Sequence, residues 1–108
     1  MIASHGGGAL PYLVGRFDKG DEVEIPSRRR IKASPSEYLK RIWYDCITYH
    51  PAALQFLISI VGADRVLFGT DYPHQVHDMK GAMANTGALP AEQCHAIREG
   101  NARRIFNI

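Results

Sequence analysis

The chain has 108 residues, of which 45% are hydrophobic and 22% charged, and its formal net charge is +2. This length suits a single domain, and the apolar content is too high and the net charge too low for an intrinsically disordered protein. The longest apolar stretch, residues 54–66, is interrupted by polar side chains, so the sequence predicts no membrane span.

The N-terminal segment predicts a strand, a glycine-rich loop and a short helix. Residues 1–4 form a brief apolar run that stops at His5 and three glycines, which is typical of a strand that ends in a tight loop. Residues 9–17 are mostly apolar and predict a short helix. Residues 18–32 are polar, include a basic run and predict a loop.

A helix start signal and a second strand follow. Ser34 is a favourable N-cap, Pro35 suits the first helical position and Glu37 completes a capping box, so a helix is expected over residues 35–41. Residues 42–45 are rich in β-branched and aromatic side chains and predict a strand.

The next segment predicts a helix and a buried strand. Apolar residues over 54–61 recur at the spacing of one helical face, with Pro51 near the start and Gly62 just past the end. Residues 65–68 form a continuous apolar run, as in strands that are buried on both faces.

The C-terminal segment is predicted to be helical. Residues 78–85 and 90–99 predict two helices, the second ended by Gly100, and residues 101–106 predict a last helical turn. Strands that alternate with helices predict parallel βαβ units and therefore the α/β class.

Two predicted strand ends carry side chains that could perform chemistry. In parallel α/β folds, functional residues lie at the carboxyl ends of strands. His5 follows the first strand and could bind metal or carry a proton; Asp71 follows the third and could bind metal or act as a base. A structural alternative stays open, in which Asp71 only caps the next turn. His74 could line a substrate pocket.

Other polar clusters favour a structural interpretation. His50, His74 and His77 could join Asp71 in a local metal site, but a polar loop favours solvated histidines. The basic run 28–32 lacks interleaved aromatic residues, so a solvated loop or subunit contact is favoured over phosphate or nucleic-acid binding.

The remaining aromatic and cysteine residues are expected to be structural. The aromatic residues expected in the core are Trp43, Tyr44, Phe56 and Phe68. The two cysteines, Cys46 and Cys94, make no disulfide framework and lack activating neighbours, so buried, inert thiols in a reducing compartment are expected. The first residues show no signal-peptide pattern, and the expected location is the cytoplasm.

A series of short motifs runs along most of the chain. They are Ser4-His5-Gly6-Gly7-Gly8-Ala9-Leu10-Pro11-Tyr12, Gly15-Arg16, Trp43-Tyr44-Asp45, His50-Pro51-Ala52-Ala53-Leu54, Val61-Gly62-Ala63-Asp64-Arg65-Val66-Leu67-Phe68-Gly69-Thr70-Asp71-Tyr72-Pro73 and Gly100-Asn101-Ala102-Arg103-Arg104-Ile105-Phe106. In this order they resemble the C-terminal portion of the amidohydrolase-2 family, in the branch that contains aminocarboxymuconate-semialdehyde decarboxylase. The Gly-Thr-Asp-Tyr-Pro motif with its apolar lead-in is the most specific part of the resemblance.

The resemblance implies a fold and a cofactor. The family fold is a distorted (β/α)8 TIM barrel with one divalent metal, usually zinc. Such a barrel has about 250 residues in eight units, so residues 1–108 are expected to form a partial barrel domain, the C-terminal segment with about strands 6 to 8.

The resemblance also implies residue roles. Asp71, at the end of the eighth strand, would be catalytic and ligate the metal, and His5, at the end of the sixth, would be the catalytic acid/base. Arg16 would hold a substrate carboxylate in the site of a neighbouring subunit, a task that suits a planar guanidinium. His74 is the second candidate substrate-binding residue.

The sequence departs from the family pattern in its metal ligands. The family also uses a His-x-His pair and a further histidine, and neither is found here. We therefore expect the chain not to bind metal alone.

The expected function is the C-terminal part of a metal-dependent enzyme that decarboxylates, without oxidation, or hydrolyses a small carboxylated substrate. The chain is expected to be inactive in isolation. The alternatives are a non-catalytic truncated remnant, or an assembly piece that completes a barrel with another chain. The expected partners are the carboxylate substrate and a second copy or complementing chain, but neither nucleic acid nor a membrane.

Overall fold

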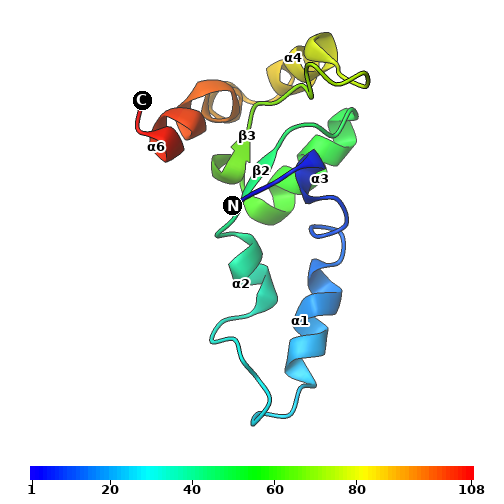
Figure 1. Ribbon diagram of the computed structural model, residues 1–108, viewed down its shortest axis with the longest axis vertical. Coiled ribbons are helices and arrows are strands. Elements are labelled where there is room, and N and C mark those ends of the chain that lie inside the picture. Colours follow the sequence, from blue (N-terminus) through cyan, green and yellow to red (C-terminus); the bar gives the residue numbers. More distant parts are fainter.

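A three-stranded parallel sheet lies at the centre of the computed structural model, which describes residues 1–108 (Figure 1). The strands, in spatial order, are β1 (Ile2–Ala3), β2 (Trp43–Asp45) and β3 (Val66–Leu67). Ile2 pairs with Trp43, and Tyr44 pairs with Val66. The predicted α/β class and the parallel, adjacent strands are confirmed.

Six α-helices and three short helical turns connect and flank the strands. The helices are α1 (Val14–Glu22), α2 (Pro35–Leu39), α3 (Pro51–Val61), α4 (Met79–Gly87), α5 (Ala91–His95) and α6 (Asn101–Phe106). The turns are η1 (His5–Gly7), η2 (Ala63–Arg65) and η3 (Ala96–Gly100), the last being π-helical. In every case the helix is too short or too polar to pass through a lipid bilayer.

Helix α1 corrects one sequence prediction. It begins at Val14 instead of residue 9 and continues to Glu22, through part of the segment expected to be a loop. Two contacts favour the helix here: Lys19 pairs with Glu22 at 2.7 Å, and Asp18 accepts a hydrogen bond of 2.8 Å from the backbone N–H of Ser36 in α2. The second contact is tertiary, so the local pattern could not show it.

A second correction concerns Gly100, which does not end its helix. Its φ of −58° and ψ of −41° are ordinary helical values, and α5, η3 and α6 follow one another without a break. Within η3 the N–H of Asn101 donates to the carbonyl of Ala96, which leaves the carbonyl of Ile97 free. That carbonyl accepts a hydrogen bond of 3.0 Å from the N–H of Phe68, just after β3. The π turn therefore attaches the C-terminal helix to the sheet.

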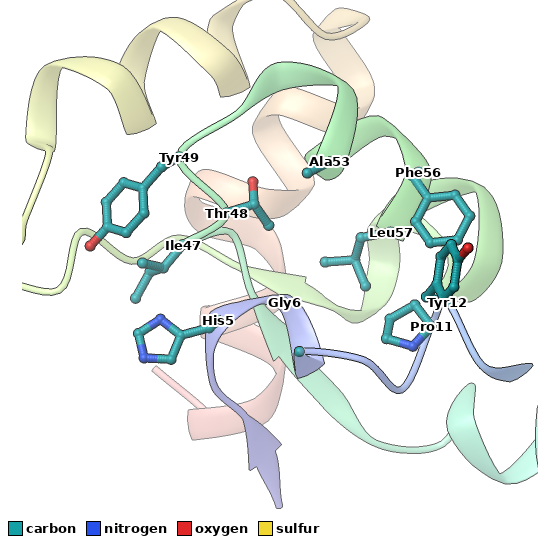
Figure 2. A pocket seen from close by; sticks show the side chains of 11 residues that line it. His5, Gly6, Pro11, Tyr12, Ile47, Thr48, Tyr49, Ala53, Phe56 and Leu57 are labelled. Carbon is teal, nitrogen blue, oxygen red and sulfur yellow. The ribbon is translucent and has the colours of Figure 1, made fainter.

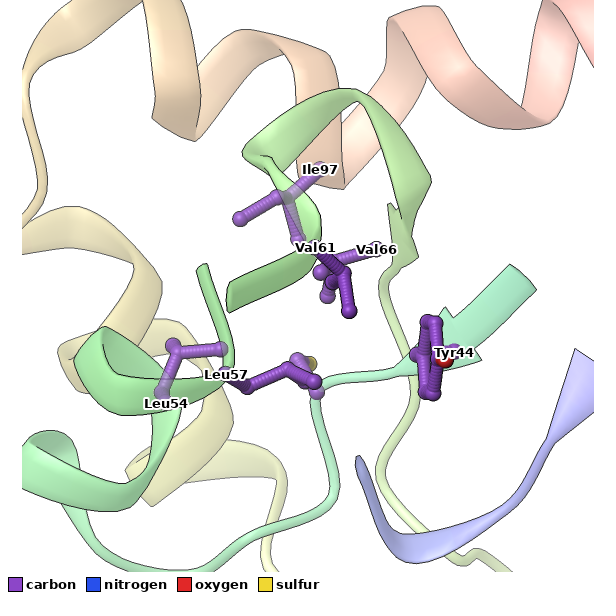
Figure 3. Packing of buried hydrophobic residues seen from close by; sticks show 7 residues of the cluster. Tyr44, Leu54, Leu57, Val61, Val66 and Ile97 are labelled. Carbon is purple, nitrogen blue, oxygen red and sulfur yellow. The ribbon is translucent and has the colours of Figure 1, made fainter. Parts of the chain in front are cut away.

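The hydrophobic core lies between the sheet, α3 and η3 (Figure 3). Its buried members are Tyr44, Cys46, Leu54, Leu57, Val61, Val66 and Ile97. The α3 residues among them share one face of the helix, as their spacing predicts.

Not all the aromatic residues expected in the core lie there. Tyr44 is fully buried, and Phe68 packs partly buried against the core. The expectation is wrong for Phe56, which is 42% exposed to solvent. Trp43 is half-buried, and the guanidinium groups of Arg65 and Arg104 each lie 5.3 Å from its ring.

Helices α1 and α2 form an arm that extends away from the sheet (Figure 1). The arm makes the molecule elongated, with extents of 49 × 29 × 26 Å and a radius of gyration of 15.3 Å. A compact domain of about 100 residues has a radius of gyration of about 13 Å. The side chains of the arm therefore lie apart from the core.

Candidate functional site

The three strand exits, meaning residues 4–8, 46–50 and 68–71, lie at one edge of the sheet because the strands are parallel. Each exit contains one non-glycine residue with a left-handed backbone. These residues are His5 (φ 54°), Tyr49 (φ 55°) and Asp71 (φ 65°). Such values are uncommon outside glycine and concentrate at functional sites.

The backbone of His5 is held by Asp45, the last residue of β2. Asp45 Oδ2 accepts a hydrogen bond of 3.0 Å from the N–H of His5, and Oδ1 accepts one of 3.0 Å from the N–H of Gly6. Both donors have left-handed backbones, so their adjacent N–H groups converge on the carboxylate, as in an anion-binding nest. The bonds use the backbone of His5 and leave its imidazole free.

Two glycines of the first exit are required by close packing. A Cβ on Gly6, which has a φ of +61°, would lie 2.9 Å from the side chain of Thr48. A Cβ on Gly7, which has a φ of +81°, would lie 2.7 Å from the ring of Tyr44. The glycine run after His5 is therefore a steric requirement of the turn.

A cavity of about 400 Å³ opens beside His5 (Figure 2). His5 and Tyr49 lie toward one end of it, and the rings of Tyr12 and Phe56 lie toward the other. These two rings are tilted against each other with centroids 6.4 Å apart. Phe56 thus lines a cavity instead of the core.

Asp71 is linked to this cavity through Tyr49. The Tyr49 hydroxyl lies 3.3 Å from Asp71 Oδ2 and donates a hydrogen bond of 2.7 Å to the carbonyl of Val76. Desolvation and the negative charge of Asp71 raise the pKa of Tyr49, so its hydroxyl stays protonated and can donate. Tyr49 therefore contacts Asp71 and also lines the cavity that His5 lines.

The other two candidate residues lie outside this cavity. His74 is exposed, and its Nδ1 accepts a hydrogen bond of 3.2 Å from the N–H of Val76. Arg16 is exposed on α1 and lines a hollow on the arm with Arg28, Arg29 and Arg30. The structure therefore does not bring Arg16 or His74 into the cavity beside His5.

Several polar side chains have structural roles. His50 caps α3, because its Nδ1 accepts a hydrogen bond of 3.2 Å from the N–H of Ala52. His77 packs edge-on against the ring of Tyr72 at 5.6 Å. Cys46 is buried, and burial raises the pKa of its thiol, in line with the expected inert thiol; the expected burial is wrong for Cys94, which is partly exposed.

The chain by itself does not contain a complete metal site. Across residues 1–108, no group of three or more His, Cys, Asp or Glu side chains is placed to hold a metal ion. The Asp71 carboxylate is one suitable ligand, but the residues present do not fit a protein-bound metal ion without further ligands.

Sequence reasoning missed Asp45 and Tyr49. Asp45 ends a predicted strand, so the rule that selected His5 and Asp71 could also have selected it. Tyr49 carries no such signal, because its contact with Asp71 joins residues 22 apart in the sequence.

Comparison with known proteins gives a consistent result. The Amidohydro_2 family model, described as amidohydrolase, matches residues 1–108. The chain is 31% identical over 97 residues to the 2-amino-3-carboxymuconate-6-semialdehyde decarboxylase of Dictyostelium discoideum, covering 89% of this chain and 24% of that protein.

Solved structures of decarboxylases are also similar to this chain. The 5-carboxyvanillate decarboxylase of Sphingomonas paucimobilis matches with a TM-score of 0.80 and 30% identity, over 99% of this chain and 33% of that one. The 5-carboxyvanillate decarboxylase of Novosphingobium aromaticivorans, complexed with manganese and 4-hydroxy-3-methoxy-5-nitrobenzoic acid, matches with a TM-score of 0.83 and 25% identity, over 99% and 32%. The chain therefore spans between a quarter and a third of the length of these proteins.

Proposed function

This chain belongs to the amidohydrolase family, and from that premise we propose that it forms the C-terminal part of the active site of a non-oxidative decarboxylase. The substrate would be a small carboxylated molecule. The observation that carries the proposal is the placement of His5, whose backbone is locked by Asp45 while its imidazole lies free beside a cavity. The decarboxylases among the relatives support the reaction class.

The chemistry requires a proton at carbon. When the bond to the carboxylate breaks, carbon dioxide leaves and the electron pair of that bond stays on the substrate carbon. The same carbon must then gain a proton, so that a C–H bond replaces the C–C bond. The His5 imidazole is the proposed carrier, because histidine exchanges protons near neutral pH and its ring faces the cavity.

Asp71 is proposed as one ligand of a divalent metal. Its carboxylate follows β3, and Tyr49 contacts its Oδ2. The other ligands would come from residues outside this chain, because residues 1–108 hold no group of three. Manganese in the Novosphingobium aromaticivorans decarboxylase supports a divalent ion; zinc, which the family resemblance implies, stays a prediction.

Arg16 and His74 are proposed to bind substrate. Arg16 lines a hollow on the arm and not the cavity beside His5, so a substrate carboxylate held by Arg16 would lie in the site of a second copy. His74 keeps its Nε2 available, because only Nδ1 accepts the bond from Val76.

The free cysteines Cys46 and Cys94 favour a reducing compartment, which supports a cytoplasmic location.

The test uses the intact enzyme that carries this chain. We would measure carbon dioxide release from 5-carboxyvanillate and from 2-amino-3-carboxymuconate-6-semialdehyde, with products identified by mass spectrometry. His5→Gln should lower kcat by about 100-fold or more, because the proton carrier is lost. The matched control is His50→Asn, which keeps a capping side chain on α3 and should leave kcat unchanged. Full kcat in His5→Gln, or products of hydrolysis without carbon dioxide, would refute the proposal.

A further inference from the structure

The carboxylate of Asp45 lies where all three strand exits meet. We propose that Asp45 is a positioning residue for the reaction, which sets where the His5 imidazole and the Tyr49 hydroxyl stand in the cavity. The inference rests on the proposed function, because it assigns a role within that reaction. Asp45 bonds to backbone groups of the first two exits and would act through the residues it holds.

The contacts to the first exit determine the orientation of His5. Asp45 is only 9% exposed, and its two oxygens receive the N–H groups of His5 and Gly6, which lie 40 and 39 residues away in the sequence. The left-handed backbone at His5 is uncommon for a residue with a side chain, and these two bonds offset its cost. Without these two hydrogen bonds, nothing would hold the turn that sets the orientation of His5.

Asp45 also holds the second exit and packs against the third. Its Oδ1 accepts a further hydrogen bond of 3.0 Å from the N–H of Ile47, and the chain then continues to Tyr49 in the cavity wall. In the third exit, a Cβ added at Gly69 would lie 3.6 Å from Asp45 Cβ and 3.0 Å from the Ile47 side chain. The segment that leads to Asp71 therefore passes close to Asp45, with no room for a larger residue at Gly69.

The three hydrogen bonds require a carboxylate. A buried charge is costly unless it is well bonded, and here three backbone N–H groups bond to it. An asparagine can still accept from Gly6 and Ile47 with its single oxygen. Its NH2 group would then face the N–H of His5, so two donors would oppose each other. Asp45→Asn should therefore release His5 while keeping most of the remaining structure.

A purely structural residue would behave differently. Asn101 provides the comparison, because it is also buried and bonds to two backbone carbonyls, those of Ala63 and Val66, at 2.8 and 2.7 Å. It joins the C-terminal helix to η2 and to the first residue of β3, and neither bond goes to a strand exit. Asn101→Ala should lower the stability of the fold without changing the geometry beside His5.

The experiment compares Asp45→Asn with Asn101→Ala in the intact enzyme. Amide hydrogen exchange, read residue by residue, reports on the N–H groups of His5, Gly6 and Ile47. In Asp45→Asn, exchange at His5 should rise about tenfold or more, as its hydrogen bond is lost, while Gly6 and Ile47 keep most of their protection. In Asn101→Ala, the exchange rate at His5 should keep the same ratio to the rates at Gly6 and Ile47 as in the wild-type enzyme.

The kinetic readout separates positioning from binding. A misplaced proton carrier reduces the chemical step, so kcat of Asp45→Asn should fall about 10- to 100-fold while KM changes less than about threefold. Gly7→Ala disturbs the same turn from the opposite side, through Tyr44, and should give the same pattern with Asp45 intact. Its matched control is Gly100→Ala in the C-terminal helix, where a Cβ meets only His95 atoms at 3.8 Å, an ordinary contact.

Two results would overturn the positioning role of Asp45. Exchange at His5 that rises no more than elsewhere, or an unchanged kcat in a folded Asp45→Asn enzyme, would overturn the positioning role. If the wild-type enzyme releases no carbon dioxide, the proposed function fails, and the exchange data still decide whether Asp45 holds the His5 turn. If Asp45→Asn does not fold, Gly7→Ala is compared with Gly100→Ala, and an unchanged kcat in a folded Gly7→Ala enzyme would overturn the positioning role of the His5 turn.

Discussion

At the scale of single residues, one buried carboxylate organises the candidate site. His5 and Gly6 donate to Asp45 from the first exit, and Ile47 donates from the second. The chemistry-bearing side chain and the residue that orients it come from different strands, so a change at Asp45 reaches His5 without touching its ring. Tyr49 extends this arrangement to Asp71 through its hydroxyl.

The two thiols should differ sharply in reactivity. Cys46 is buried, and its Sγ lies 3.4 Å from both the N–H and the carbonyl of Gly69, whereas Cys94 is partly exposed. Burial raises the pKa of Cys46, which keeps its thiol protonated. We expect iodoacetamide at pH 8 to modify Cys94 first and Cys46 only on unfolding, as peptide mass spectrometry would show. Equal labelling of both in the folded protein would contradict the buried placement.

The raised pKa of Cys46 predicts that the folded protein loses stability at alkaline pH. The folded state holds the Cys46 proton more tightly than the unfolded chain, whose thiol has a pKa near 9.0. The stabilisation is therefore complete below that pH and is lost as the pH rises through the folded pKa. Urea unfolding at increasing alkaline pH should show this loss, and Cys46→Ala should remove this part of the pH dependence.

At the scale of elements, the π turn η3 has the clearest structural consequence. The extra residue in this turn frees the carbonyl of Ile97, which pairs with Phe68 and so continues the hydrogen bonding of β3 beyond its last residue. π turns are frequently found at functional sites. Here the turn anchors the start of the third strand exit, which ends at Asp71.

Gly100 should tolerate alanine. Its backbone is helical, and a Cβ would meet only His95 atoms at 3.8 Å, which is ordinary contact. Alanine favours a helix interior over glycine, so Gly100→Ala should raise the free energy of unfolding by about 0.5–1 kcal/mol. Chemical denaturation measures this change. A loss of stability would contradict the helical backbone and the ordinary contacts at Gly100.

At the scale of the whole molecule, the chain buries few of its residues. Only 13 of 108 residues are buried, and large apolar side chains such as Ile2, Tyr12 and Phe106 are exposed. One edge of the sheet is partly covered, because Phe68 pairs with Ile97, but β1 pairs only with β2 and leaves its outer edge open. An open strand edge is a template for pairing with another chain.

The isolated 108-residue chain should therefore self-associate at micromolar concentration. Light scattering would show masses above that of a monomer, and Ile2→Lys should reduce the association, because a charge on an edge strand opposes pairing. The control is Ile108→Lys, which adds the same charge at the C-terminal residue; Ile108 is 77% exposed against 45% for Ile2, and it lies outside the sheet. A monomeric mass with cooperative unfolding would show that the chain closes its own core.

The sequence by itself determined the features that depend on neighbouring residues. The N-cap of α2 at Ser34, the apolar face of α3 and the parallel strand order all follow from local spacing, and the structure confirms them. Placing His5 and Asp71 after strands also needed only the strand pattern and the family resemblance.

The tertiary structure decided everything that depends on distant contacts. The C-terminal extension of α1 is supported by the bond from Ser36 to Asp18, and the continuation of the helix through Gly100 goes with the bond from Phe68 to Ile97. Asp45 acquires its role only when a turn 40 residues away folds onto it. Such contacts depend on how strands and helices pack, which no local pattern encodes, and for that reason the residues that orient the site emerged only from the fold.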